Sequence, residues 1–204
     1  MNLPNALTLL RIFFVPLLVA ALVSERLSIE FAGFTISNHL LALAIFLAAA
    51  GTDLLDGYLA RRWGQVTTVG TLLDPIADKL LVSAALISLV QVHALPAWMA
   101  ILIVGREFAV SGLRSIAAAE GYVIKASDLG KTKTVAQVIG CSMLMVGMGW
   151  PRWHRPAIFV MWAVMIFALA SALDYFRKFW RRVDDEVKNR RRRELLMAEH
   201  RQPV

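Results

Sequence analysis

The sequence predicts an all-α integral membrane protein with six transmembrane helices. Of its 204 residues, 58% are hydrophobic and only 18% are charged, and the mean hydropathy is +0.59. Apolar runs recur six times, each bounded by a polar segment or by one that contains Gly or Pro. No repeat or linker divides them, so residues 1–204 are expected to form one domain, with 178–204 as a basic cytoplasmic tail. The six runs are Leu7–Val23, Leu40–Ala50, Leu80–Val92, Leu95–Val104, Val135–Gly149 and Ala157–Leu173.

The first apolar run is expected to be a membrane helix and not a removable leader. Arg11 lies inside the run, and no small-residue cleavage pattern stands out before Ser24. A charged residue within the apolar stretch is atypical of a secretion signal, so we count this run as the first span.

The second and third runs are too short to cross the membrane by themselves. A span needs about 20 residues at ~1.5 Å per residue to cross a hydrocarbon core of ~30 Å. Both reach that length only if the second helix begins near Asn38 and the third near Gly70, which brings aspartates into each. The connection 62–69 is short enough to make the two helices antiparallel neighbours. We therefore expect four carboxylates to meet at one membrane face: Asp53, Asp56, Asp74 and Asp78.

The remaining runs are expected to form the last three helices. Pro96 suits the first turn of the fourth helix, and residues 128–134 lead into the fifth. The fifth run holds the only cysteine, Cys141, which is expected to be a small packing residue and can form no disulfide within one chain. In the tail, acidic residues among the basic ones favour a solvated helix lying on anionic lipid. We assign the tail no nucleic-acid binding.

Lysines and arginines set the expected orientation of the helices. The chain from Arg177 onward holds ten of the 22 basic residues, and the loops after the second and fourth helices are basic as well. Positively charged loops stay on the cytoplasmic side, so both termini and the aspartates are expected there. One loop disagrees, because Arg152 and Arg155 would then lie outside.

Four aspartates in so apolar a chain indicate a functional site. A carboxylate inside hydrocarbon costs roughly 2.5–3.5 kcal/mol even on the lenient insertion scale. The i, i+3 and i, i+4 spacings put each pair on one face of its helix, and oxygen ligands suit Mg²⁺ or Mn²⁺. Two such cations would balance the charge and clamp the oxygens of a phosphoryl substitution. The alternative is helix packing with Asp–Arg pairs, but one or two arginines do not balance four aspartates.

The same residues resemble the signature of a known family. The pattern Asp53-x2-Asp56-Gly57-x2-Ala60-Arg61-x8-Gly70-x3-Asp74-x3-Asp78 is similar to that of the CDP-alcohol phosphotransferases at every defining position. The resemblance implies a six-helix enzyme, often a homodimer, in a bacterial cytoplasmic (inner) membrane. Such an enzyme moves a phosphatidyl-type group from a CDP-linked donor to an alcohol and releases CMP.

The resemblance also implies a role for individual residues. The four aspartates would bind two divalent cations, Mg²⁺ or Mn²⁺, and Asp78 would act in addition as general base on the incoming hydroxyl. Only the family analogy selects Asp78 from the four. The CDP moiety of CDP-diacylglycerol would be contacted by Gly57, Arg61 and Thr67.

A second set of charged residues bears on the acceptor alcohol. Arg106, Glu107 and Arg114 interrupt the fourth helix, and Lys131 and Lys133 lie where the N-terminus of the fifth helix favours anions. An acceptor with its own phosphate would need these four cations. A Glu107–Arg114 ion pair and an ordinary basic loop are the alternatives. These residues are expected to border a cytoplasmic cavity that is also lined by Asn5, Thr8, Arg11 and Glu107. Arg11 also suits a snorkelling anchor.

With these outer motifs, the sequence resembles the branch of the family that joins CDP-diacylglycerol to sn-glycerol 3-phosphate. The implied products are phosphatidylglycerol phosphate and CMP, and inositol phosphate or phosphatidylglycerol is the nearest alternative acceptor. A cation transporter is the alternative from another class, since intramembrane aspartates cluster there too. Against it, the carboxylates are expected near one membrane face, and no internal repeat is visible.

Overall fold

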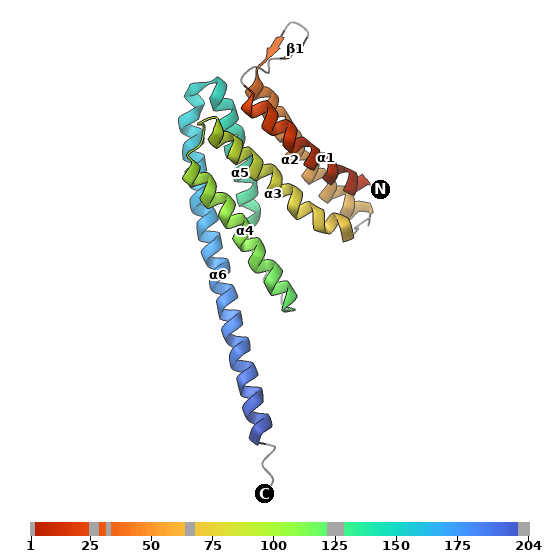
Figure 1. The fold of residues 1–204 in the computed structure, drawn as a ribbon, viewed down its shortest axis with the longest axis vertical. Coiled ribbons are helices and arrows are strands. Elements are labelled where there is room, and N and C mark those ends of the chain that lie inside the picture. The colour runs from red at the N-terminus through yellow and green to blue at the C-terminus, as the bar shows by residue number, and fades with distance from the viewer. Residues whose placement is uncertain (1–2, 25–28, 32–33, 64–67, 122–128, 200–204) are drawn as a thin grey trace.

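The computed structural model describes most of the chain. Its backbone is described for residues 3–24, 29–31, 34–63, 68–121 and 129–199. Its side chains are described for residues 6–24, 37–52, 73, 75–121, 134–184 and 188. Within these ranges the protein is a bundle of helices with one short hairpin at its edge (Figure 1).

Six α-helices follow one another along the described chain, which confirms the predicted all-α class. They are α1 (Leu3–Val23), α2 (Asn38–Trp63), α3 (Thr68–Gln91), α4 (Ala97–Ala119), α5 (Leu129–Gly149) and α6 (His154–Glu199). A short 3-10 helix, Pro151–Trp153, leads into α6. The sequence analysis did not predict the antiparallel hairpin between α1 and α2, which is made of β1 (Ile29–Phe31) and β2 (Phe34–Ile36).

The helices extend beyond the apolar runs that predicted them. α2 begins at Asn38 as expected but continues to Trp63, and α3 begins at Thr68, so the connection shrinks to residues 64–67. α4 likewise continues past Val104 to Ala119. Backbone hydrogen bonds and intrinsic propensity can extend a helix past the apolar segment that packs or faces lipid. An apolar run therefore marks only part of each helix.

α6 passes without a break from the predicted span into the predicted tail. Its 46 residues correspond to a length of roughly 69 Å, and Figure 1 shows its C-terminal part projecting beyond the other helices. On its surface, Lys178 Nζ donates to Asp174 Oδ2 at 2.7 Å, one helical turn away. The backbone of residues 178–199 is thus helical, as the charge pattern favoured.

The helices pack as an up-and-down bundle. α1 packs on α2 and α3, α5 packs on α6 and α2, and α4 packs on α6. The hairpin and the α3–α4 and α5–α6 connections gather at one end (Figure 1). The start of α1 and the ends of α2 and α3 that flank residues 64–67 lie together away from that end. α2 and α3 are also in contact, as neighbouring antiparallel helices should be.

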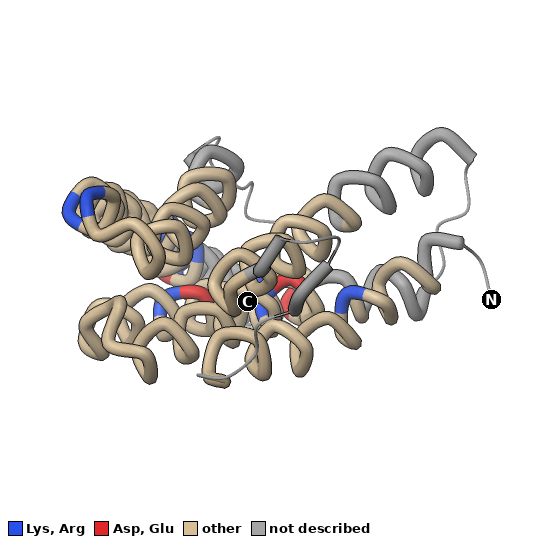
Figure 2. The backbone as a smooth tube through the Cα atoms, turned by 90° about the horizontal axis from the view of Figure 1, so that it is seen from above, with Lys and Arg blue, Asp and Glu red and all other residues tan. Residues whose placement is uncertain are grey.

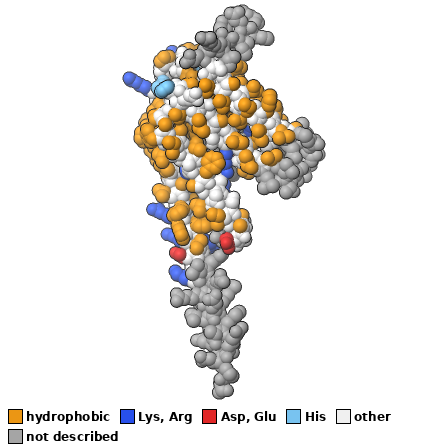
Figure 3. All heavy atoms as spheres, viewed as in Figure 1, with side chains coloured by type: hydrophobic (Ala, Val, Ile, Leu, Met, Phe, Trp, Pro, Cys, Tyr) orange, Lys and Arg blue, Asp and Glu red, His pale blue; other side chains and the backbone are white. Residues whose placement is uncertain are grey.

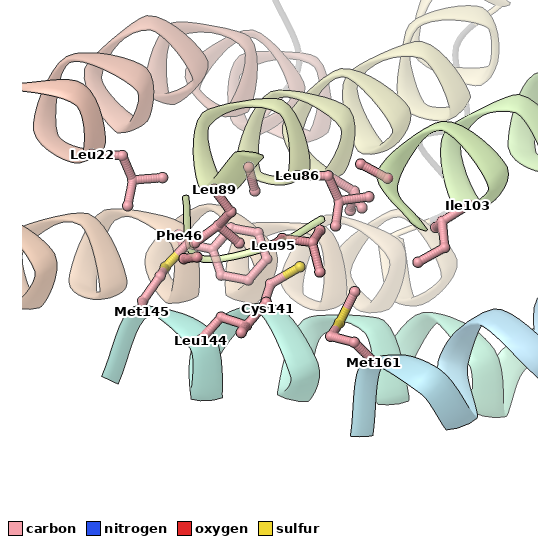
Figure 4. Close-up of a cluster of buried hydrophobic side chains, with 14 of the residues drawn as sticks. Leu22, Phe46, Leu86, Leu89, Leu95, Ile103, Cys141, Leu144, Met145 and Met161 are labelled. Atoms are coloured by element: carbon pink, nitrogen blue, oxygen red, sulfur yellow. The ribbon is translucent and has the colours of Figure 1, made fainter. Parts of the chain in front are cut away.

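The apolar core lies toward the end where the hairpin and these two connections gather. All six helices contribute buried side chains to it, and Figure 4 shows them converging. Cys141 is completely buried there as a free thiol, which fits its predicted role in packing. Other members are Leu22 of α1, Phe46 of α2, Leu89 of α3, Ile103 of α4, Leu144 of α5 and Met161 of α6.

The outer faces of the bundle are apolar. Two described segments, Ala6–Val23 and Pro151–Asp184, are long and apolar enough to span a membrane, and shorter apolar stretches occupy Asn38–Thr52 and Thr134–Gly149. Large side chains lie exposed, including Phe159 at 77%, and Figure 3 shows hydrophobic atoms covering much of the face in view. Soluble monomers rarely expose apolar patches of this extent. These features indicate a membrane protein, whereas six spans remain a prediction.

The close approach of α5 to the start of α6 predicts that substitutions at two glycines will differ in their effect on stability. A Cβ at Gly147 would lie 3.1 Å from His154 Cα and 3.2 Å from His154 N, whereas nothing lies within 4 Å of a Cβ at Gly112. Gly147→Val should therefore lower the free energy of unfolding by about 1–3 kcal/mol more than Gly112→Val. Thermal unfolding in detergent, followed by circular dichroism, measures the difference. Equal losses would contradict this account of the packing.

Candidate functional site

Polar side chains from three helices line a small cavity inside the bundle. Its volume is about 20 Å³, which is room for one water-sized group. Figure 2 shows acidic positions toward the middle of the bundle, with basic positions both near them and at its edge. We call this space the Asp78 cavity. It is lined by Asp78, Lys79, Val82 and Ser83 of α3, Val104 and Glu107 of α4, and Thr134 and Gln137 of α5.

Helical spacing places these side chains on facing surfaces. Residues three or four apart share a helix face, as do Thr134 and Gln137 on α5 and Val104 and Glu107 on α4. Asp78 lies roughly 15 Å along α3 from the observed start at Thr68. Because the sequence analysis expected that start near Gly70, Asp78 lies about half a turn deeper in the helix than predicted.

Arg106 ties α4 to α6 beside this cavity. Its Nε donates to the carbonyl oxygen of Ala168 at 3.0 Å, and its Nη2 donates to Ser171 Oγ at 2.9 Å. Its Nη1 donates to Glu107 Oε1 at 3.0 Å, and only 8% of the Arg106 side chain is exposed. Three of the five N–H donors of the guanidinium are thereby used. The bond from Nη1 holds Glu107 where it lines the Asp78 cavity, and as far as the described side chains show, two donors remain for a ligand.

Arg114 also rests against α6. Its Cζ lies 5.5 Å from the centroid of the Tyr175 ring, within the range of a cation–π contact. The sequence analysis considered an ion pair between Glu107 and Arg114, whereas the structure pairs Glu107 with Arg106 and stacks Arg114 on Tyr175. One face of α6, formed by Ala168, Ser171 and Tyr175, therefore supports both arginines of α4.

Thr8 and Arg11 of α1 are buried away from the Asp78 cavity. Their exposed fractions are 1% and 0%, and neither lines the cavity. A snorkelling side chain keeps its charged head in water, so the alternative role of Arg11 as a snorkelling anchor is wrong. α1 packs on α2 and α3, which places Arg11 on the helix that contacts both aspartate-bearing helices.

Most of the remaining predicted side chains lie outside the described residues. Among the side chains that the structure describes, no group of three His, Cys, Asp or Glu residues could hold a metal ion. The predicted metal site is not tested by this finding, because three of its four carboxylates are not in that set. The predicted residues that lie outside are Asn5, Asp53, Asp56, Gly57, Arg61, Thr67, Asp74, Lys131 and Lys133.

The structure adds residues that the sequence analysis did not assign. Lys79, Ser83 and Gln137 line the Asp78 cavity, and Ser171 and Tyr175 support the arginines from α6. Gln137 had a usable signal in the sequence, since a polar side chain in an apolar helix is itself a candidate site residue. The α6 residues had none, because their partners are distant in the chain.

Comparison of the sequence with known proteins identifies the class to which this protein belongs. The family model described as CDP-alcohol phosphatidyltransferase matches residues 1–174. That range holds the aspartate signature and every residue of the Asp78 cavity. The chain belongs to this family, and the protein is an enzyme of this kind.

Three bacterial relatives share one more specific name, CDP-diacylglycerol–glycerol-3-phosphate 3-phosphatidyltransferase. The relative from Bacillus subtilis is 43% identical over 185 residues, which cover 88% of this chain and 95% of the relative. The one from Pseudomonas fluorescens is 33% identical, with 98% and 100% covered. The one from Rickettsia felis is 38% identical, with 72% and 76% covered. The similarity is therefore not confined to the aspartate signature.

The hydrogen bonds of Arg106 predict energetic coupling between α4 and α6. Ser171→Ala removes one acceptor and should cost about 1 kcal/mol of stability, whereas Arg106→Leu should cost about 3 kcal/mol or more because Glu107 loses its cation. The variant that carries both substitutions should lose less free energy of unfolding than the two single variants lose together. Thermal unfolding of the four proteins measures the coupling, and Ser115→Ala on the exposed face of α4 is the control. Strict additivity would show that the contact does not join the helices.

Proposed function

We propose that the enzyme transfers the phosphatidyl group of CDP-diacylglycerol to sn-glycerol 3-phosphate, giving phosphatidylglycerol phosphate and CMP. One observation carries the proposal: Asp78, from the aspartate signature, shares a cavity with Glu107 and Thr134, from the two segments expected to bind the acceptor. The names of the three relatives support the same donor and acceptor.

The proposed reaction is a substitution at the phosphorus of the phosphatidyl group. The oxygen of an acceptor hydroxyl forms a bond to this phosphorus as the bond from phosphorus to the CMP oxygen breaks. The hydroxyl proton passes to a carboxylate oxygen of Asp78, and CMP leaves with the electron pair. Asp78 lines the cavity together with Glu107 and Thr134, and this position supports its assignment as general base.

Two divalent cations fit the chemistry of the signature residues. The aspartates offer only oxygen ligands, which suit Mg²⁺ or Mn²⁺, and they belong to α2 and α3, which pack on each other. When bound, the cations would screen the pyrophosphate charge and stabilise the departing CMP. The residues that would hold them are Asp53, Asp56, Asp74 and Asp78.

The substrates would be held by residues on three helices and one connection. On the donor side, the CDP moiety would be contacted by Gly57, Arg61 and Thr67. On the acceptor side, the phosphate would take charge-assisted hydrogen bonds, including those from the two donors that Arg106 has left. The acceptor phosphate would be bound by Arg106, Arg114, Lys131 and Lys133.

Tryptophans support a position for α6 in the bilayer. Trp153, the last residue of the 3-10 helix before α6, is 43% exposed, and Trp180 of α6 is 50% exposed. The chain rises roughly 40 Å between them along the axis of α6. A bilayer with its interfacial regions is ~40–45 Å thick, and tryptophan prefers those regions. We therefore infer that α6 crosses the membrane as one of six spans. In a bacterial inner membrane, both termini and the site would face the cytoplasm.

Family membership decides between the classes of function considered for the aspartates. A CDP-alcohol phosphatidyltransferase is an enzyme, so the cation-transporter alternative is set aside. Inositol phosphate and phosphatidylglycerol are the alternative acceptors. The resemblance further predicts a homodimer, which light scattering of the detergent-solubilised protein would measure.

An acceptor panel tests the reaction directly. Purified protein with CDP-diacylglycerol and Mg²⁺ or Mn²⁺ should release CMP when given glycerol 3-phosphate, and the lipid product should have the mass of phosphatidylglycerol phosphate. Chelation of the metal should stop the release. Inositol phosphate, phosphatidylglycerol and serine are the competing acceptors. Product formation with one of these instead would contradict the acceptor, and no release with any acceptor would contradict the reaction.

Asp78→Asn tests the proposed general base. It should lower kcat by about 100-fold or more. The affinity for CDP-diacylglycerol should stay largely intact, and the affinity for Mn²⁺ should fall much less than kcat because the amide keeps one oxygen ligand; calorimetry measures both affinities. Asp174→Asn is the matched control. Among the described residues Asp174 forms an exposed pair with Lys178, so this substitution should leave kcat unchanged. If Asp78→Asn chiefly weakens CDP-diacylglycerol binding, Asp78 is a ligand and not the base.

Arg114→Ala and Lys131→Ala test the acceptor side. Each should raise KM for glycerol 3-phosphate about tenfold, since a charge-assisted contact is lost, with a smaller effect on KM for the donor. Tyr175→Leu should raise the same KM by removing the ring under Arg114, whereas Tyr175→Phe keeps the ring and should not. Lys178→Ala on the surface of α6 is the charge control. Equal changes in both KM values would contradict the acceptor pocket.

A further inference from the structure

Gln137 is a buried amide that faces the Asp78 cavity. It lies in the third turn of α5, and 3% of the residue is exposed. Within the part of the chain that the structure describes, its Nε2 has no hydrogen-bond partner. Buried polar groups are almost always hydrogen-bonded, so an unpaired donor that lines a cavity points to a group that binds there.

The side chains around the cavity define the chemistry of that group. Asp78 and Glu107 present carboxylates, Ser83 presents a hydroxyl, and the volume is about 20 Å³. A phosphate would be repelled by the two carboxylates and exceeds the space for one water-sized group. A hydroxyl fits, because its O–H can donate a hydrogen bond to a carboxylate while its oxygen accepts one from the Gln137 amide.

We propose that Gln137 is a specificity-determining residue that recognises a second hydroxyl of the acceptor. Its Nε2–H donates to the oxygen of the hydroxyl on the middle carbon of glycerol 3-phosphate, and the terminal hydroxyl is the one that attacks. Donation to the attacking oxygen would draw electron density from the nucleophile, so the amide serves the hydroxyl that does not react. This inference rests on the proposed function.

A comparison of two acceptors in two proteins tests the inference. Glycerol 3-phosphate is compared with 3-hydroxypropyl phosphate, which lacks only the middle hydroxyl. In the wild-type protein, kcat/KM should be about tenfold or more higher for glycerol 3-phosphate. In Gln137→Leu the preference should fall to within about twofold, because glycerol 3-phosphate loses its hydrogen bond and the analogue loses nothing. Gln137→Glu, which keeps the size but removes both N–H donors, should lose the preference as well.

A control variant separates recognition from packing. Ser142→Ala lies farther along α5, and its hydroxyl donates to the Val138 carbonyl oxygen at 2.8 Å within the same helix. It should keep the wild-type preference. Thermal unfolding of each variant records whether it is folded.

The outcomes distinguish this inference from the proposed function. No CMP release by the wild-type protein with glycerol 3-phosphate would overturn the proposed function. Wild-type turnover with no preference between the two acceptors would overturn the inference alone, and this measurement needs no variant. An unchanged preference in both Gln137 variants, or equal loss of activity toward both acceptors, would also overturn it.

Discussion

The three hydrogen bonds of Arg106 are the interaction on which the polar interior of this bundle depends. They join α4 to α6 through Ala168 and Ser171 and hold the Glu107 carboxylate beside the Asp78 cavity. A carboxylate within an apolar bundle is tolerated only when a cation and hydrogen bonds compensate for its lost hydration. α6 therefore helps to shape the site although none of its described side chains lines the cavity.

The bundle has two regions with different roles, an apolar core and a polar cavity. Toward the hairpin, the buried side chains of all six helices form a continuous apolar core, with Phe46, Leu89 and Met161 among its fully buried members. Close packing of this kind holds helices in one arrangement. The polar cavity lies farther along α3, α4 and α5. A rigid core beside a small polar space holds the functional side chains in place without lining the site itself.

The cavity lies at the junction between two groups of helices with different tasks. α2 and α3 carry the aspartate signature, which is proposed to serve the CDP-linked donor. α4 and α5 carry the basic residues expected to meet the acceptor. Asp78 and Gln137 face the cavity from opposite sides of that junction, so a base and a hydrogen-bond donor are both available to an alcohol that enters it. The proposed reaction follows from this juxtaposition.

The sequence by itself determined the all-α class and the family, and it predicted the aspartates that the proposed site depends on. Helical periodicity and signature spacing are properties of neighbouring residues, so they can be recognised without a fold. Only the tertiary structure decided that Arg11 is buried, that Glu107 pairs with Arg106, and that Gln137 faces Asp78. Such outcomes depend on contacts between distant segments, as with Arg106 and Ser171, which are 65 positions apart. No local pattern in the sequence encodes which helix faces meet.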